Sequence, residues 1–453
     1  MTTTEETVTS RRARLSAAWR SGPFDVPAFR LLTAGQFAST IGDYCYAVAL
    51  PWMVLSGGGS AASLGIVLAC YGIPRALLTL VGGSLADRFG PRLVMLASDA
   101  GRCGLTAVFA VLAAEHASSL AAVAPVAAAL GACSALFLPA SMTIMPALIE
   151  ESRLTSANAL YTGVVQVGSM LGPVLGGVLV AATGPTPAFA VDAGSFLLSA
   201  ASIALIRGVG GRAADAAEPG AAAGAAAEGI GSTLVADEAA MAGAGVGVAG
   251  SDASESESVW GLLRRSPILQ IILVVSVTAN FALTGTTEVA LPALAHARFG
   301  ADGYGAVLTC VAAASIAGAL LVARVGDRFR PAMLIVGVFL VAAAAIAAAP
   351  FLGGLPGLAA AMAVFGLAVG FDNVISVTLI QRWAPPAMLG RVWGLLMLAS
   401  VGSFPVSTFM AGVLARHLGP TPVFPIAGAV LAAAVLFGLS RREFRDFRGG
   451  TSG

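Results

Sequence analysis

Long apolar runs separated by short polar connections fill the chain from residue 28 to residue 440. A run of roughly 20 apolar residues in an α-helix is long enough to cross the hydrocarbon core of a bilayer. Backbone polar groups must be satisfied internally in lipid, and runs this long and rich in Gly and Ala favour helices over barrel strands. The pattern predicts twelve membrane-spanning helices, at about 28–55, 62–86, 92–114, 118–148, 155–182, 186–206, 267–297, 302–326, 331–351, 355–382, 388–416 and 421–440.

One connection is unusually short and charged. Between two apolar runs, the ten residues from Gly83 to Arg92 carry one acid, Asp87, and two arginines. Such a short connection makes the flanking helices antiparallel neighbours. A similar charged hairpin, Asp-Arg-Phe-Arg-Pro at 327–331, returns about halfway along the chain. Recurrence of this kind is typical of a protein built from two related halves.

Two further matches support this duplication. Val-Ala-Leu-Pro at 48–51 recurs at 289–292, and Gly-Pro-Thr-Pro at 184–187 recurs at 419–422. Their offsets of 241 and 235 residues bracket the 240 residues between the two hairpin aspartates. We therefore predict an all-α polytopic membrane protein made of two pseudo-symmetric six-helix bundles.

The domain organisation follows from composition. Residues 1–27 are polar and Arg-bearing, which predicts a disordered tail. The first bundle is expected at 28–207 and the second at 266–440, with a short tail at 441–453. Between the bundles, residues 208–258 consist largely of Ala, Gly and Ser with eight acids and one arginine, so we interpret 208–265 as a flexible linker.

Composition and charge place the chain in a membrane. It is 57% hydrophobic and only 11% charged, whereas soluble domains are about 25% charged. All 25 basic residues are arginines, and 21 of them fall in, or within four residues of, the tails, the linker and the even-numbered connections. By the positive-inside rule both termini and the linker are cytoplasmic, and we expect a multi-pass protein of the plasma membrane, the inner membrane in a bacterium.

Polar residues inside the spans need a physical reason, because a charge at the bilayer centre costs at least ~2.5–3.5 kcal/mol. Helical spacing places two sets of them on one face each: Thr33, Gln36, Thr40 and Asp43 in the first span, and Ser276, Asn280, Thr284 and Glu288 in the seventh. We predict that the two faces line a shared water-filled cavity. The alternative is that small hydroxyl residues only let helices approach closely. The sequence offers no obvious partner for Asp192 or Asp372, and Asp372 with Asn373 is the better cavity candidate because it falls close to the middle of the tenth span.

Buried charges of opposite sign suggest two ion pairs. Arg75 lies near the middle of the second span, as Asp43 does in the first. A pair between them would leave an acid that responds to a proton or to substrate, since desolvation favours the neutral carboxyl and a guanidinium favours the ionised one. The alternative is a fixed pair that holds two helices in register. Asp99 and Arg102 lie one turn apart on the third span, and we interpret them as a structural pair.

Catalytic and metal-binding patterns are missing from the sequence. The three histidines fall at predicted outer ends, and no cluster has metal-ligand spacing. We find no phosphate-binding glycine loop before a lysine and no channel filter sequence. The five cysteines are scattered through apolar runs and are expected to be free thiols. The sequence predicts no enzyme, no metal, no cofactor and no nucleic-acid partner.

Two motifs carry a resemblance to the major facilitator superfamily. The first matches its loop 2–3 signature: Gly83, Asp87, Arg88, Gly90 and Arg92. The second, in the predicted fifth helix, is similar to the antiporter motif of its drug exporters: Gly163, Gly172, Pro173, Gly176 and Gly177. The first span, and Asp99 with Arg102, resemble the branch that contains macrolide-efflux and enterobactin-exporter-like proteins. The resemblance covers nearly the whole chain except the tails and the linker.

This resemblance implies the major facilitator fold and export of a hydrophobic drug or natural product by alternating access. From the residues themselves we expect proton entry to drive the export, with Asp43 as the leading protonation site and Arg75 modulating it. The expected partners are a small-molecule substrate, protons and the lipid bilayer, and the protein is expected to be a monomer. A carrier for a small metabolite or a siderophore is the alternative, and a membrane sensor or scaffold is another. The predicted fourth helix lacks the arginine that many drug–proton antiporters carry there, so that motif does not supply the proton coupling.

The resemblance also implies gating roles for the two motifs. Asp87, at the cytoplasmic end of its helix, can accept charge-assisted hydrogen bonds from an arginine or a helix N-terminus and so latch one gate. The alternative is that the loop only fixes topology. In the fifth helix, glycines and Pro173 remove side-chain bulk and one backbone donor, which permits a bend and close helix packing.

Overall fold

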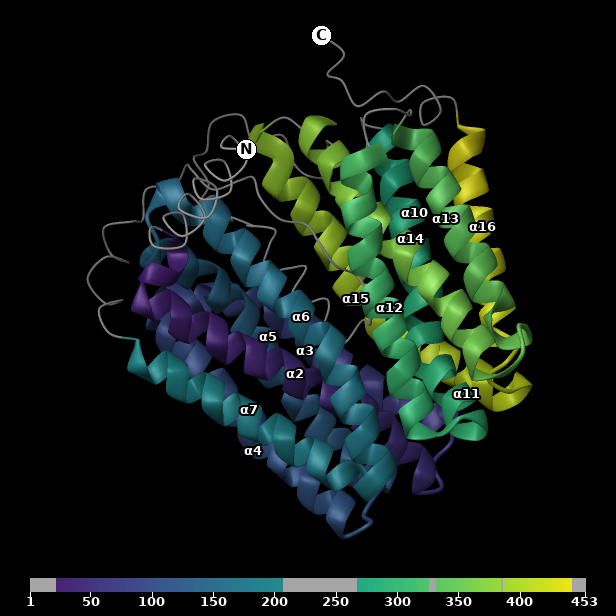
Figure 1. Cartoon of the computed structure of the whole chain (residues 1–453), viewed down its shortest axis with the longest axis horizontal. Coiled ribbons are helices and arrows are strands. Elements are labelled where there is room, and N and C mark those ends of the chain that lie inside the picture. The colour runs from purple at the N-terminus through teal and green to yellow at the C-terminus, as the bar shows by residue number, and fades with distance from the viewer. Residues whose placement is uncertain (1–21, 207–266, 326–330, 384–385, 442–453) are drawn as a thin grey trace, which may run out of the picture.

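A computed structural model describes residues 22–206, 267–325, 331–383 and 386–441 of the chain. The described part of the first half contains a short 3-10 turn, η1 (Pro23–Asp25), and six long helices: α2 (Pro27–Ser56), α3 (Ala61–Phe89), α4 (Pro91–Ala114), α5 (Leu120–Leu148), α6 (Glu151–Thr183) and α7 (Pro185–Leu205). These form the purple-to-teal bundle of Figure 1.

The second half repeats this arrangement with one interruption. Its elements are α10 (Pro267–Gly285), the π-helical segment η2 (Thr286–Ala290), α11 (Leu291–Arg298), α12 (Gly300–Val325), α13 (Pro331–Ala348), the 3-10 turn η3 (Ala349–Phe351), α14 (Gly354–Trp383), α15 (Pro386–Leu418) and α16 (Val423–Ser440). Because α10, η2 and α11 follow one another as a single span, the described residues form twelve spans in two bundles. The predicted fold class is confirmed.

Local sequence explains the sharp boundaries between helices. Gly90 alone separates α3 from α4 and has a positive φ of 84°, which glycine adopts without strain. Pro91 and Pro185 then open α4 and α7, where a missing N–H costs nothing. At the start of α3, Ser60 and Ser63 form a reciprocal capping box. The tight hairpin predicted around Asp87 is therefore present.

Apolar side chains cover the outside of both bundles. Leu77, Leu197 and Leu320 are 65%, 62% and 68% exposed, which suits a surface that faces lipid tails. By length and composition, ten described stretches are apolar enough to cross a membrane. The helices α2 and α15, at 30 and 33 residues, are also long enough to span it.

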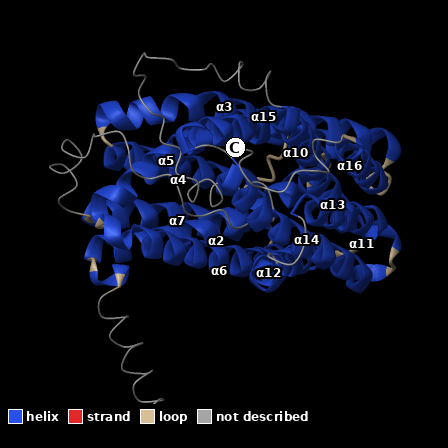
Figure 2. Cartoon of the chain, turned by 90° about the horizontal axis from the view of Figure 1, so that it is seen from above, coloured by secondary structure: helices blue, strands red, loops and turns tan. Residues whose placement is uncertain are grey.

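The two bundles contact each other along two helix pairs, α3 with α15 and α6 with α12. Figure 2 places these pairs along opposite edges of the molecule. We name the side where α2 begins and α16 ends the terminal side, and the opposite side the distal side. In Figure 1 the ribbons of α6 and α12 lie together toward the distal side and separate toward the terminal side.

Glycine pairs make the distal contact close. A Cβ atom on Gly65, at the distal end of α3, would lie 3.1 Å from the Cα atom of Gly412 on α15. One on Gly177 of α6 would lie 3.0 Å from the Cα atom of Gly305 on α12. Nearby, the rings of Trp52 and His296 meet edge to face at 4.7 Å. The bundles are thus joined on the distal side.

Some predicted features differ from the structure or lie outside it. Within the stretch expected as an N-terminal tail, 1–27, the described residues include η1, where Pro23 is buried and the Phe24 ring contacts that of Phe29 at 5.3 Å. The seventh span is broken by η2 and is not one regular helix. The tail residues 1–21, the linker 208–265, the hairpin residues 327–330 and the C-terminal residues 442–453 lie outside the described residues.

Candidate functional site

Asp43 lines a small cavity inside the first bundle. The cavity of about 20 Å³ has room for a single water molecule. Four helices of the bundle, α2, α3, α5 and α7, supply its lining: Asp43, Tyr46, Tyr71, Leu130, Ser134, Asp192 and Phe196. All of this lining belongs to the first bundle, so the shared cavity expected between Asp43 and Glu288 stays a prediction.

Asp192 on α7, which the sequence left without an assigned neighbour, lines the same cavity as Asp43. It is buried, with 1% of its surface exposed. A Cβ atom on Gly42 would lie 2.6 Å from its Oδ1 atom, so the absence of a side chain at Gly42 lets this carboxyl approach α2 directly beside Asp43. Asp43, the other acid of the cavity, is about 150 residues away from Asp192 along the chain. No local spacing could therefore have revealed that the two acids lie together. The available signals were the presence of an acid inside an apolar span and the glycine immediately before Asp43.

Tyr71 connects Arg75 to this cavity. The Arg75 side chain is buried, and its Cζ atom lies 5.7 Å from the centroid of the Tyr71 ring, which lines the cavity. The same ring lies 6.5 Å from the ring of Phe404 on α15. Arg75 and Asp43 therefore both lie near Tyr71, and the Tyr71 ring also contacts the second bundle.

Tyr46 brings a hydroxyl group to the same cavity. Its ring is held edge-on by Phe109 and Phe189, with centroids 5.6 and 5.7 Å away. The residue is only 4% exposed, and its hydroxyl forms no hydrogen bond within the part of the chain that the structure describes. The cavity is therefore lined by two carboxyl groups, Asp43 and Asp192, and a buried phenol.

Asp99 and Arg102 form the ion pair that their spacing predicted. Both side chains are buried on α4, at 0% and 1% exposure. The Arg102 guanidinium lies between two rings, those of Phe137 on α5 and Phe196 on α7, each with its centroid 4.3 Å from Cζ. Cation–π contacts strengthen when desolvated. This pair ties three helices together, and Phe196 separates it from the Asp43 cavity.

Three residues of the polar face predicted for the first span, Thr33, Gln36 and Thr40, are buried. The Thr40 hydroxyl donates to the Gln36 carbonyl at 2.8 Å. Thr40 also packs against α6, where a Cβ atom on Gly168 would lie 3.1 Å from the Thr40 Cβ atom. Ser39 donates a long hydrogen bond of 3.5 Å to Asp43. Close helix approach, the alternative considered from the sequence, describes Thr40 better than a cavity lining.

In the seventh span a side chain opens the helix. In a regular helix the Gly285 N–H would bond to the Phe281 carbonyl. Here the hydroxyl of Ser407, from α15, accepts a hydrogen bond from the Gly285 N–H at 2.8 Å and donates one to the Phe281 carbonyl. This inserted hydroxyl coincides with the start of η2, as expected when a side chain enters the backbone ladder. Glu288 is buried and lies within η2.

The remaining cavity candidates of the second bundle are tied to neighbours. Asn280 donates to the Ser276 carbonyl at 3.0 Å and accepts from Ser400 of α15 at 3.2 Å. On α14, Asp372 accepts a hydrogen bond of 2.9 Å from Ser376, and the adjacent Asn373 is buried. These groups lie on different helices from those that line the Asp43 cavity.

In the loop 2–3 motif one residue has a contact that the sequence did not predict. The Arg92 guanidinium donates to the carbonyls of Ile203 and Ala204, at 3.2 and 2.6 Å, at the end of α7. A cation that binds the last carbonyls of a helix stabilises that end. Asp87 and Arg88 are exposed on the terminal side, and Gly83 has open space around its Cα atom.

The fifth-helix motif lies at the contact between bundles. A Cβ atom on Gly305 of α12 would lie 2.5 Å from the Pro173 carbonyl oxygen, and Gly177 meets the same glycine. Gly172 and Gly176 face the other way, where added Cβ atoms would lie 2.5 and 2.9 Å from Tyr44 Cβ and Cys45 Cα of α2. Gly163 is exposed, with open space around it. The motif thus packs α6 against both bundles.

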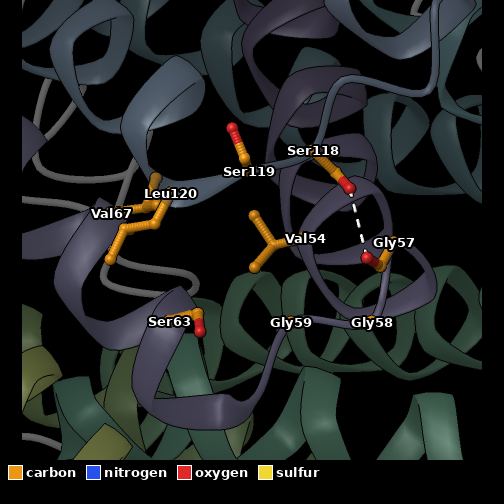
Figure 3. Close-up of a pocket in the computed structure, with 9 residues that line it drawn as sticks. All are labelled: Val54, Gly57, Gly58, Gly59, Ser63, Val67, Ser118, Ser119 and Leu120. Carbon is orange, nitrogen blue, oxygen red and sulfur yellow. Dashed lines mark hydrogen bonds between the residues drawn. The ribbon is translucent and has the colours of Figure 1, made fainter.

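A second cavity opens on the distal side, away from the acids. It has a volume of about 170 Å³ and is lined by backbone at Gly57, Gly58 and Gly59 and by three serines. Figure 3 shows the Ser118 hydroxyl donating to the Gly57 carbonyl across it, at 3.3 Å. Among the described residues no group of three His, Cys, Asp or Glu side chains could hold a metal ion. All five cysteines are free thiols, as expected.

Comparisons with known proteins agree on one family. The sequence profile of the Major Facilitator Superfamily matches residues 32–304 and 279–450. The multidrug efflux pump Tap of Mycolicibacterium fortuitum is 29% identical over 409 residues, which cover 88% of this chain and 91% of that protein. The enterobactin exporter EntS of Citrobacter koseri is 24% identical over 429 residues, covering 93% and 94%.

Two solved structures share the fold. The nucleoside transporter NupG superposes with a TM-score of 0.69 at 13% identity, covering 91% of this chain and 99% of that chain. A bacterial homologue of the iron transporter ferroportin, in an inward-facing state, gives 0.66 at 15% identity, covering 93% and 98%. At these identities the likeness concerns the fold alone.

Proposed function

Because the chain belongs to the major facilitator superfamily, we propose that it exports hydrophobic drugs or natural products and that proton entry drives the export. The observation that carries this proposal is the likeness to a multidrug efflux pump along nearly the full length of both chains. The fifth-helix motif supports it, because that motif packs against the second bundle through Gly177 and Pro173. Such a contact must rearrange whenever the two bundles rock.

In this proposal the terminal side faces the cytoplasm of a bacterial inner membrane. The arginine distribution supports that orientation through the positive-inside rule. The bundles meet on the distal side, at the Gly65–Gly412 and Gly177–Gly305 pairs. The described conformation is then the one that faces inward, and a monomer can take up substrate from the cytoplasm or the inner leaflet in this state.

Export requires that the distal contacts break while a cytoplasmic contact forms. Asp43 is the proposed proton-binding residue and Arg75 modulates it, since both lie beside Tyr71 at the cavity. Tyr71 also packs against Phe404 of the second bundle, so rearrangement of the bundles changes the surroundings of the acid. Asp87 is exposed in this conformation, which suits a latch that closes only in the other state.

A siderophore is the second candidate substrate class. Its support is the likeness to an enterobactin exporter over 93% of this chain. The two relatives thus point to two substrate classes, drugs and a siderophore. Transport competition between the two classes separates them.

Accumulation in cells tests the proposal. Cells with and without the chain are loaded with hydrophobic antibiotics, the dye ethidium and a catechol siderophore, and retained compound is measured. The proposal expects lower retention of at least one hydrophobic compound, and a protonophore should restore its retention. Equal retention of every hydrophobic compound, with the chain present in the membrane, would contradict drug export; loss of the siderophore alone would favour the second candidate.

A further inference from the structure

We propose that Asp43 and Asp192 jointly hold one exchangeable proton, with the Tyr46 hydroxyl as the third polar group of this site. The inference rests on the proposed function and deepens it, because it replaces a single acid with a two-carboxyl site inside the first bundle. The ligand is a proton, bound in a cavity large enough for one water molecule.

The geometry points to a site that is built and not incidental. Two carboxyl groups from different helices line the same cavity, and Gly42 makes room for the second of them. The Tyr46 ring is fixed by two aromatic neighbours, Tyr46 is one of the residues that line the cavity, and its hydroxyl has no hydrogen-bond partner among the described residues. A buried hydroxyl without a partner is costly. A protonated carboxyl, or a water bound to it, would give this hydroxyl one.

Charge counting sets the number of protons. With both acids ionised and Arg75 charged, the group carries one net negative charge. Burial of net charge is disfavoured, so uptake of a single proton, which forms one carboxyl O–H bond, makes the group neutral. If Asp43 alone bound the proton and Asp192 played no part, replacing Asp192 would not change the number of protons that the group takes up.

The other groups that face this site do not change the count. From α3 come Tyr71 and Arg75, and from α5 come Ser134 and Leu130. On α4, Cys103 is near Asp192, and Asp99 and Arg102 already neutralise each other. The contact from α6 to Cys45 is made by the Gly172 carbonyl, which is uncharged. Asp43 is half-buried whereas Asp192 is fully buried, so Asp43 is where the proton enters and leaves.

Infrared titration of the purified full chain in lipid tests the site without any substrate. The carboxyl C=O stretch reports protonated acids, and the number that titrate per molecule is read against pH. When the pH is lowered, wild type should gain one protonated carboxyl per molecule. Asp43→Asn and Asp192→Asn should each gain none, because the remaining acid then balances Arg75. Arg75→Met should gain two. Glu115→Gln, an exposed acid in the connection between α4 and α5, is the matched control and should behave as wild type.

Tyr46→Phe gives a second, spectroscopic readout. It should keep the proton count but shift the C=O band to the frequency of a less hydrogen-bonded carboxyl. Wild-type titration in Asp192→Asn would overturn the proposal, as would a band that sodium ions alter and protons do not. Should Asp192→Asn not fold, Arg75→Met decides, since a gain of only one proton there contradicts the charge count. If the carboxyls titrate as expected but the cells export no drug, only the proposed function is overturned. If the cells export drug but the carboxyls do not titrate, only the Asp43–Asp192 site is overturned.

Discussion

Single charged residues inside the first bundle have two different kinds of surroundings. Arg102 is enclosed by Asp99 and two aromatic rings, which fixes it in one position. Asp43 lines a cavity and is half-buried, so it can exchange with its surroundings. From this contrast we expect Arg102 and Asp99 to stabilise the fold and Asp43 to act in transport. Mutations should therefore affect stability at the first site and transport at the second.

Replacement of Arg102 by Met should mainly destabilise the protein. It leaves Asp99 buried without its cation, which typically costs about 3–5 kcal/mol. Thermal unfolding of the solubilised protein measures the loss, and the double change with Asp99→Leu should recover most of it. Arg153→Met is the matched control, because its pair with Glu150 is long, at 4.0 Å, and exposed. Equal stability of Arg102→Met and wild type would contradict the structural role.

Replacement of Asp43 by Asn should instead leave folding intact and abolish uphill export. Without an exchangeable proton the bundles can still rock, so downhill movement of substrate should persist. Arg75→Ala alone should lower export more than the double variant Asp43→Asn/Arg75→Ala, because the single change leaves both acids without their cation. Transport by membrane vesicles, with and without a pH gradient, measures both. Wild-type accumulation that still depends on pH in Asp43→Asn would remove Asp43 from the mechanism.

At the scale of the element, the seventh span has a break that depends on one hydroxyl. Ser407→Ala should let the Gly285 N–H bond directly to the Phe281 carbonyl and so extend α10 through the break. Stability should change by no more than about 1 kcal/mol, because one hydrogen bond replaces two. Turnover should fall by about tenfold, or ~1.4 kcal/mol, as Glu288 rotates out of place.

Ser403 provides the control for this variant. It lies on the same helix, is 9% exposed, and among the described residues its hydroxyl bonds to the carbonyl of Ser400 in its own helix. Ser403→Ala should therefore transport normally. Turnover measured with one fluorescent substrate compares the two variants, and Ser407→Thr, which keeps the hydroxyl, should transport better than Ser407→Ala. Equal turnover of Ser407→Ala and Ser403→Ala would show that the break is only structural.

The loop between α3 and α4 combines two tasks that variants can separate. Asp87→Asn should slow turnover without lowering the amount of protein in the membrane, because it removes a charged contact made in one state only. Asp25→Asn, an exposed acid on the same side but outside the loop, is the control. The measurement is the export rate of Asp87→Asn, Asp25→Asn and wild type at matched expression. Unchanged export by Asp87→Asn would leave the loop a role in topology alone.

Sequence predicted what is local and missed what is brought together by folding. Hydropathy located the spans, and a three-residue spacing located the Asp99–Arg102 pair. Asp192 could not be assigned, because its neighbours lie on α2 and α3. The Ser407 insertion could not be foreseen either, since a serine in an apolar helix usually bonds to its own backbone. Arg92 was recognised through its motif, but its contact with the end of α7 depends on tertiary packing.

At the scale of the whole molecule, the duplication explains why the bundles meet through equivalent helix pairs. The second and eleventh spans and the fifth and eighth spans each meet at glycines on the distal side. Transport then depends on how easily these contacts separate. A side chain added at one of them should shift the equilibrium between the two states while leaving each bundle intact, because the contact is made only between bundles.

Gly412→Val tests this idea. Its Cβ atom would lie 2.8 Å from the Ala61 carbonyl oxygen, so the distal ends of α3 and α15 must move apart. We expect the distal side to open, export to fall, and a cysteine introduced by Trp52→Cys to become reactive toward a maleimide that cannot cross the membrane. Gly402→Val is the matched control on the same helix, because an added Cβ atom there meets nothing within 4 Å. Labelling is compared with the same chains that keep Trp52, which corrects for the native cysteines. If Gly412→Val labels no faster than Gly402→Val, the distal glycines do not hold the gate, and closure on that side must depend on other contacts, such as that between Trp52 and His296.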